Sequence, residues 1–198
     1  MGDPKKQGKK FSKPVKPWEK ERIEEESAIT KEFGLKNKQE IWRANSQLRN
    51  FFAQAKKSIS VESDQGEKEK AQLLKRLATL GLIGGTSQVE DVLNLTVRDI
   101  LLRRLQSIVA NKSMARSMSQ SRQFIVHEHI MVNGKKITSP GYLVKVNDDV
   151  TFAPNSDLAK QDHPERATAK EIVEIAEKRE KKKLKAVKVQ KGRRGGRR

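Results

Sequence analysis

The sequence contains no cysteine, which excludes disulfide bonds and thiolate metal sites. Aromatic residues make up only 5% of the 198 positions and hydrophobic residues 34%, so part of the chain is expected to lack the apolar surface needed to fold alone. No apolar run approaches the length that crosses a membrane, and residues 1–14 lack the apolar core of a secretion signal. We therefore expect a soluble, intracellular protein with no membrane partner.

Positive charge is what the sequence has in excess. It holds 43 Lys and Arg against 25 Asp and Glu, a formal net charge of +18. Each phosphate that a basic side chain neutralises releases condensed counterions, so this excess predicts a polyanionic partner. Solubility alone is the plainer explanation, but it seldom needs so large a charge. The composition favours a nucleic acid as the partner.

Both ends of the chain are basic and poor in aliphatic residues. Residues 1–17 combine lysines with prolines and are expected to form an extended arm. Residues 161–198 are expected to form a polar helix from Pro164 to about residue 185 and a disordered tail. From residue 178 onward this end holds twelve Lys or Arg against Glu180, and we expect it to order only along phosphates.

The segment 18–101 shows repeated helix signals. Capping boxes are predicted at Asn37 with Glu40 and at Thr96 with Asp99, and glycines 34, 81 and 84–85 mark helix ends or turns. We expect helices near 19–33, 38–59, 67–80 and 97–108, with Arg103 and Arg104 facing outward from the last. The expected apolar stripe of the second helix is Ile41, Ala44, Leu48, Phe52, Ala55 and Ile59.

The pattern changes after residue 117. Ser117 with Gln120 predicts a short helix over 118–127, and Asn133-Gly134 is a strong hairpin signal after the alternating residues 130–132. Further short strands are expected from Val144, Val146, Val150 and Phe152. The predicted class is α+β: a helical N-terminal half, then a helix-helix-sheet module and a long basic tail. The expected segments are 1–17, 18–101, 102–160 and 161–198.

Residues 102–152 carry ordered landmarks of a known module. They include Arg103-Arg104-Leu105-Gln106, Ala115-Arg116, Ser121-Arg122-Gln123, His129-Ile130 and Val132-Asn133-Gly134. This stretch resembles the small RNA-binding module named after small-subunit ribosomal protein S-four. The stretches GDPKK, KPWEKERIEEE and FGLKNKQEIWRANSQLRNF resemble the start of that ribosomal protein in its archaeal and eukaryotic form. The sequence departs from the family pattern at Gln106 (often Asp), Glu128 (usually Gly) and Asn147 (often Gly).

The resemblance implies a non-enzymatic, cytoplasmic protein of the small ribosomal subunit that needs no cofactor. It implies a primary binder of 16S-type ribosomal RNA that nucleates assembly of the subunit body. It also implies a place beside ribosomal protein S-five, near the point where messenger RNA enters, and a contribution to translational accuracy. The residues expected to contact RNA are Lys5, Lys6, Lys9, Lys10, Arg43, Arg49, Arg103, Arg104, Lys112, Arg116, Ser121, Arg122, Gln123, His127, His129, Asn133, Lys135 and Lys136.

Other functions fit the sequence less well. His127-Glu128-His129 resembles a metal site, but two ligands at i and i+2 share a face only on a strand, and no further ligand is close in sequence. No catalytic motif is present, and residues 81–85 lack the Lys-Ser/Thr of a phosphate-binding loop. An RNA-modifying enzyme or a general basic protein that carries the module stays an alternative, and residues 1–100 discriminate against both because they resemble the ribosomal protein.

Overall fold

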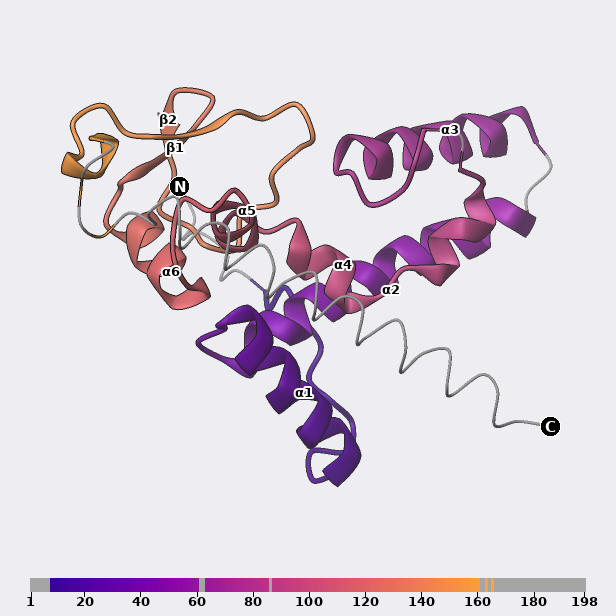
Figure 1. The fold of residues 1–198 in the computed structure, drawn as a ribbon. Coiled ribbons are helices and arrows are strands. Elements are labelled where there is room, and N and C mark those ends of the chain that lie inside the picture. Colours follow the sequence, from indigo (N-terminus) through magenta and orange to yellow (C-terminus); the bar gives the residue numbers. More distant parts are fainter. Residues whose placement is uncertain (1–7, 61–62, 86, 161–162, 164, 166–198) are drawn as a thin grey trace, which may run out of the picture. The chain divides into compact units, whose positions relative to one another are not determined.

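The computed structural model describes residues 8–60, 63–85, 87–160, 163 and 165. The expected C-terminal helix and tail, and the first seven residues of the arm, lie outside this part. Figure 1 shows the helices and strands of the described part. This part divides into two compact units, one within residues 8–108 and 139–149 and one within residues 109–138 and 150–165. The first is helical and the second contains a small sheet, so the predicted α+β class is confirmed. The four segment boundaries stay predictions.

The first unit is built from helices with well-defined ends. Gly34 ends the first of them in the left-handed conformation (φ 56°), and its N–H donates to the Thr30 carbonyl, as expected of a C-cap glycine. The Thr96–Asp99 capping box is present, with the Thr96 N–H donating to the Asp99 carboxylate at 2.8 Å. The helices are α1 (Lys20–Phe33), α2 (Lys38–Ser60), α3 (Asp64–Thr79), the 3-10 helix η1 (Val89–Asn94) and α4 (Val97–Leu102).

The apolar stripe of α2 follows a slightly different register from the predicted one. Phe51 and Ser58 are buried, whereas Phe52 is half-buried and Ile59 is exposed. The buried positions therefore alternate in steps of three and four along the whole helix, which keeps them on one face. The prediction was wrong for the second phenylalanine and for Ile59 because two adjacent phenylalanines satisfy a local periodicity equally well.

A buried carboxylate joins α1 to α2. Glu26 is 6% exposed, and its Oε1 accepts hydrogen bonds from Arg22 Nη1 (2.6 Å) and from Trp42 Nε1 (3.0 Å). Lys38 Nζ lies 3.6 Å from the other oxygen. The ring of Phe11, from the described part of the N-terminal arm, lies 6.0 Å from the Trp42 ring. Trp42 therefore packs within the protein, and Phe11 gives the arm a contact on α2.

The expected helix over 97–108 is interrupted, so that prediction was wrong. Helix α4 ends at Leu102 and α5 (Leu105–Asn111) begins after two residues. At the break the Leu105 N–H donates to the Tyr142 carbonyl (2.8 Å), and the Val144 N–H donates to the Arg103 carbonyl (3.1 Å). The segment 139–149 thus takes the backbone hydrogen bonds that would have continued the helix.

The second unit contains α6 (Met118–Val126), β1 (Ile130–Val132), β2 (Lys135–Lys136), β3 (Val150–Phe152) and the 3-10 helix η2 (Asp157–Ala159). The strands form an antiparallel sheet in the order β2-β1-β3. Val150 and Phe152 lie in β3 as predicted. The strands expected around Val144 and Val146 are not formed. Both residues belong to the first unit and bond to its backbone, Val146 to the Thr79 carbonyl (2.9 Å).

Candidate nucleic-acid interface

The loop before α6 places Arg116 at the helix entrance. Ser117 caps the helix by accepting from the Gln120 N–H (3.2 Å), while Gln120 Oε1 accepts from the Arg116 N–H (2.7 Å). In the predicted capping box the Gln120 side chain would accept from the Ser117 N–H, but it accepts from the N–H of the preceding residue, Arg116. Ala115 is fully buried and Arg116 is exposed. The backbone is thus fixed on both sides of an exposed guanidinium.

Helix α6 has a buried face and a polar face. Phe124 and Ile125 lie in the core, and the Phe124 ring meets the Phe152 ring of β3 in an edge-on arrangement at 6.4 Å. Gln123 is exposed and Arg122 is half-buried. Because two core side chains lock the helix, these two polar residues are held in place.

Ser121 lies on the buried face of the same helix. Its side chain is fully buried, and its hydroxyl donates to the Ser117 carbonyl one turn earlier (3.0 Å). The residue was expected to contact RNA by a neutral hydrogen bond to phosphate or ribose. Its burial is explained by its spacing from Phe124 and Ile125, and we leave it out of the proposed contact set.

Glu128 lies just beyond the C-terminal end of α6. Its φ is 62°, in the left-handed region, its N–H donates to the Ile125 carbonyl (3.2 Å), and the His129 N–H donates to the Phe124 carbonyl (3.0 Å). These two bonds form a Schellman motif, in which glycine is the usual residue at this position. This geometry suits the glycine that the family resemblance leads one to expect at this position. The Glu128 carboxylate lies 3.5 Å from Lys136 Nζ, so its charge is paired with a neighbouring lysine.

The two histidines have different surroundings. His129 Nδ1 lies 2.8 Å from Ser156 Oγ, and its ring meets the Phe124 ring edge-on at 6.2 Å. His127 is exposed at the helix end. Within the described ranges no group of three or more His, Cys, Asp and Glu is placed to hold a metal ion. Ser156 is the partner that the sequence does not indicate, because it lies 27 residues from His129.

The hairpin tip presents two lysines. Asn133 (φ 50°) and Gly134 (φ 75°) both take the left-handed conformation, as a two-residue type I′ turn requires, and Val132 pairs with Lys135 across it. The predicted Asn-Gly hairpin is confirmed. Lys135 and Lys136 are both exposed.

Arg104 does not face outward, contrary to the prediction. Its side chain is 8% exposed and is paired with the Glu40 carboxylate of α2. Next to it, Gln106 Nε2 donates to the Gly34 carbonyl (3.0 Å), which joins the same segment to the end of α1. Arg103 is half-buried, and its Nη2 donates to the Val144 carbonyl (2.9 Å). This landmark of the module therefore holds the first unit together, and we leave Arg104 out of the proposed contact set.

The remaining candidates lie in the first unit. Lys9, Lys10 and Arg49 are exposed, and so is Arg43, whose guanidinium lies 5.8 Å from the Phe11 ring centre. Lys5 and Lys6 lie outside the described residues. These positions stay proposals because each is a single exposed charge.

The second unit offers a strongly basic surface on a rigid support. Residues 109–138 contain five Lys or Arg and one carboxylate, which belongs to Glu128. RNA duplexes are recognised through shape, phosphates and 2′-hydroxyls, which suits fixed cations and amides on a helix and a hairpin. No helix in the described part of the chain is long and apolar enough to cross a membrane.

Similarity to known proteins extends over most of the chain. The family model for the S4 domain matches residues 103–150. The small ribosomal subunit protein uS4 of Methanococcus maripaludis strain C5 is 48% identical over 174 residues, which are 85% of this chain and 97% of that protein. The protein of the same name from Methanococcus vannielii is 47% identical with the same coverage. That from Ignicoccus hospitalis is 45% identical over 163 residues, 81% of this chain and 98% of that protein.

Proposed function

The chain belongs to the uS4 family of small ribosomal subunit proteins, and from this membership we propose that it binds the RNA of that subunit. It is a structural constituent of the cytoplasmic ribosome and not an enzyme. The similarity reaches far beyond the module at 103–150, which argues against an RNA-modifying enzyme that merely carries it.

The basic surface of the second unit is the observation that supports RNA binding. Arg116, Arg122, Lys135 and Lys136 come from a capped helix start, the helix itself and a hairpin tip, all supported by the core of Phe124, Ile125 and Ile130. Arginine and lysine held on such a support can bind phosphates at fixed spacing. With Lys112, Gln123, His127, His129 and Asn133, they form the proposed contact set of this unit.

The finer roles rest on the family resemblance. A primary binder has to fold before it meets other proteins, and both units have their own buried core. We propose on this basis that the protein nucleates assembly of the subunit body. Contact with ribosomal protein S-five, proximity to entering messenger RNA and a contribution to translational accuracy complete the proposal.

The proposal is tested by titrating a 16S-type ribosomal RNA transcript with the full chain at several salt concentrations. Replacing Arg116 and Arg122 with alanine should weaken binding and lower the slope of log K against log salt by roughly 0.7–0.9 for each phosphate that is no longer neutralised. A matched control is Lys68→Ala with Lys75→Ala, which removes the same charge from exposed positions of α3. A slope equal to that of the control variant contradicts the assignment of the interface.

The ribosomal role is tested separately by following the tagged protein through a sucrose gradient. We expect it to migrate with small subunits. Migration only with free-protein fractions would exclude a constituent of the subunit, whatever the outcome of the titration.

A further inference from the structure

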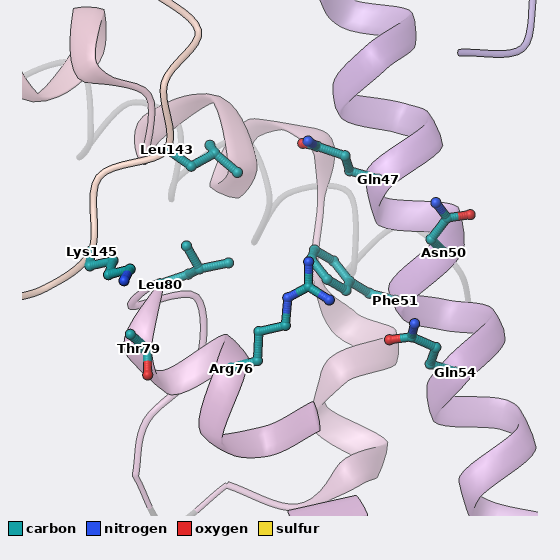
Figure 2. Close-up of a pocket in the computed structure, with 9 residues that line it drawn as sticks. All are labelled: Gln47, Asn50, Phe51, Gln54, Arg76, Thr79, Leu80, Leu143 and Lys145. Carbon is teal, nitrogen blue, oxygen red and sulfur yellow. The ribbon is translucent and has the colours of Figure 1, made fainter. Parts of the chain in front are cut away.

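A cavity of about 460 Å³ lies within the first unit and is lined only by residues of that unit. Figure 2 shows the side chains of α2 on one side of it and those of the α3 end and the segment 139–149 on the other. Its volume falls within the roughly 300–1,000 Å³ of pockets that hold small molecules. The lining residues are Gln47, Asn50, Phe51, Gln54, Arg76, Thr79, Leu80, Leu143 and Lys145.

Three carboxamides line the α2 side. Gln47, Asn50 and Gln54 are spaced by three and four residues, so they share one face of the helix. Each carboxamide offers an acceptor oxygen and two N–H donors. Within the described part of the chain, none of the three makes a side-chain hydrogen bond to protein, and all three are exposed. The donors and acceptors are therefore available to a ligand.

A stacked cation lies beside them. The Arg76 guanidinium lies 5.6 Å from the centre of the Phe51 ring, and Phe51 is 6% exposed. Figure 2 shows Arg76 extending from α3 across this ring. Guanidinium planes and aromatic rings are the groups on which unpaired RNA bases stack. Leu80 and Leu143 add apolar surface on the same side of the cavity.

The charge of the cavity favours an anion. Arg76 and Lys145 are the charged members of the lining, and the nine lining residues, all of them in the described part, include no carboxylate. Lys145 is exposed, and Figure 2 shows its side chain reaching toward the cavity. A nucleotide supplies the three matching features: a flat base, polar base edges and a phosphate.

We propose that this cavity receives one unpaired nucleotide of the small-subunit RNA, with its base on Arg76 and its phosphate beside Lys145. The α2 carboxamides bind the edge of the base, with which a single Asn or Gln side chain can form two hydrogen bonds. The proposal rests on the proposed function, since the RNA that supplies the nucleotide is the one the protein binds.

The test uses the full chain and the 16S-type transcript, probed with reagents that modify the Watson–Crick edges of all four bases. The pocket variant Gln47→Met with Gln54→Met removes two carboxamides and keeps unbranched side chains that suit a helix. The matched control is Gln39→Met, at an exposed position of α2 that does not line the cavity. The variant Arg76→Ala removes the stacking cation, and Lys75→Ala serves as its control.

We expect the wild-type protein and Gln39→Met to protect one unpaired nucleotide that the carboxamide variant leaves reactive, with all other protections unchanged. Arg76→Ala should weaken binding about tenfold, as expected when a base no longer stacks, and Lys75→Ala much less. Replacing that nucleotide with an abasic residue removes both the stack and the edge contacts, so it should cost wild type at least the same factor and cost Arg76→Ala less than it costs wild type.

Two results overturn the proposal and leave the RNA-binding function standing. One is a footprint and an affinity that are the same for all variants. The other concerns chemical modification of the protein's own cavity side chains. If RNA leaves them reactive and only added ribosomal proteins protect them, the cavity binds a protein segment. Failure of every variant and of wild type to protect the transcript would instead reject the proposed function itself.

Discussion

Glu128→Gly should make the second unit more stable than Glu128→Ala does, because Glu128 has a left-handed backbone (φ 62°). A side chain with a Cβ costs roughly 1–2 kcal/mol in this conformation. Glycine avoids that cost, but its greater conformational freedom stabilises the unfolded chain by about 0.4–1 kcal/mol. Both variants lose the ion pair with Lys136, whose removal therefore cancels in the comparison. The glycine variant should be the more stable by about 0.5–1 kcal/mol.

The two variants should bind RNA equally well, and better than wild type. Each removes a carboxylate 3.5 Å from the Lys136 ammonium group, so a neighbouring negative charge no longer offsets the lysine charge. A unit charge at about 4 Å is worth about 1 kcal/mol in water, which corresponds to a roughly fivefold gain in affinity at low salt. Stability thus separates glycine from alanine, whereas affinity separates both from wild type.

The stability assay has to report on the correct unit. Both tryptophans, Trp18 and Trp42, belong to the first unit, so their fluorescence would follow the wrong transition. Hydrogen exchange of the His129 amide, which bonds to the Phe124 carbonyl at 3.0 Å, follows the motif directly. Equal protection in the glycine and alanine variants would refute the account of backbone strain. An RNA affinity unchanged in both would place Glu128 and Lys136 away from the RNA.

Two further changes test the first unit by chemical denaturation of the full chain. Arg104→Met should lower the free energy of unfolding by about 3 kcal/mol because the Glu40 carboxylate loses its buried arginine. Adding Glu40→Gln should recover most of that stability. A loss below about 1 kcal/mol would mean that water replaces the arginine. Gly81→Ala should cost at least about 1–2 kcal/mol, since Gly81 has φ +66° and a Cβ there would lie 2.7 Å from Val146 Cγ2. Gly85→Ala, where a Cβ would meet nothing within 4 Å, should be nearly neutral, and equal effects of the two would contradict this interpretation.

Features set by neighbouring residues were predictable from the sequence. The Asn133-Gly134 turn, the Thr96–Asp99 box and the Gly34 cap were all confirmed, because in each the conformation depends on a few residues close in the chain. The helical first half and the small sheet followed from the change in hydrophobic period near residue 130. Local signals of this kind fix where elements begin and end.

Features set by distant residues were not predictable. Arg104 was expected to face outward because the helical pattern placed Leu101 and Leu105 inward, but its partner Glu40 is 64 residues away. The break in the helix at residue 103 depends on hydrogen bonds from the segment 139–149, which periodicity cannot show. The choice of Phe51 over Phe52 likewise depends on what packs against α2. Each error concerns an interaction made across the fold.

The same distinction bears on how RNA-binding residues are identified. A search of the sequence for basic side chains selects Arg104, which is paired with Glu40 inside the protein. The same search misses Gln47, Asn50 and Gln54, because they carry no charge. Yet their spacing along α2 puts three carboxamides on one face of the helix, at a cavity with a stacked arginine. Phosphate contacts set affinity and its salt dependence, whereas amides at base edges select a nucleotide. Variants of the basic surface and variants of the cavity are therefore expected to differ in one measurable respect. Replacing arginines of the basic surface should change the slope of log K against log salt. Replacing the carboxamides of the cavity should change the affinity and leave that slope unchanged.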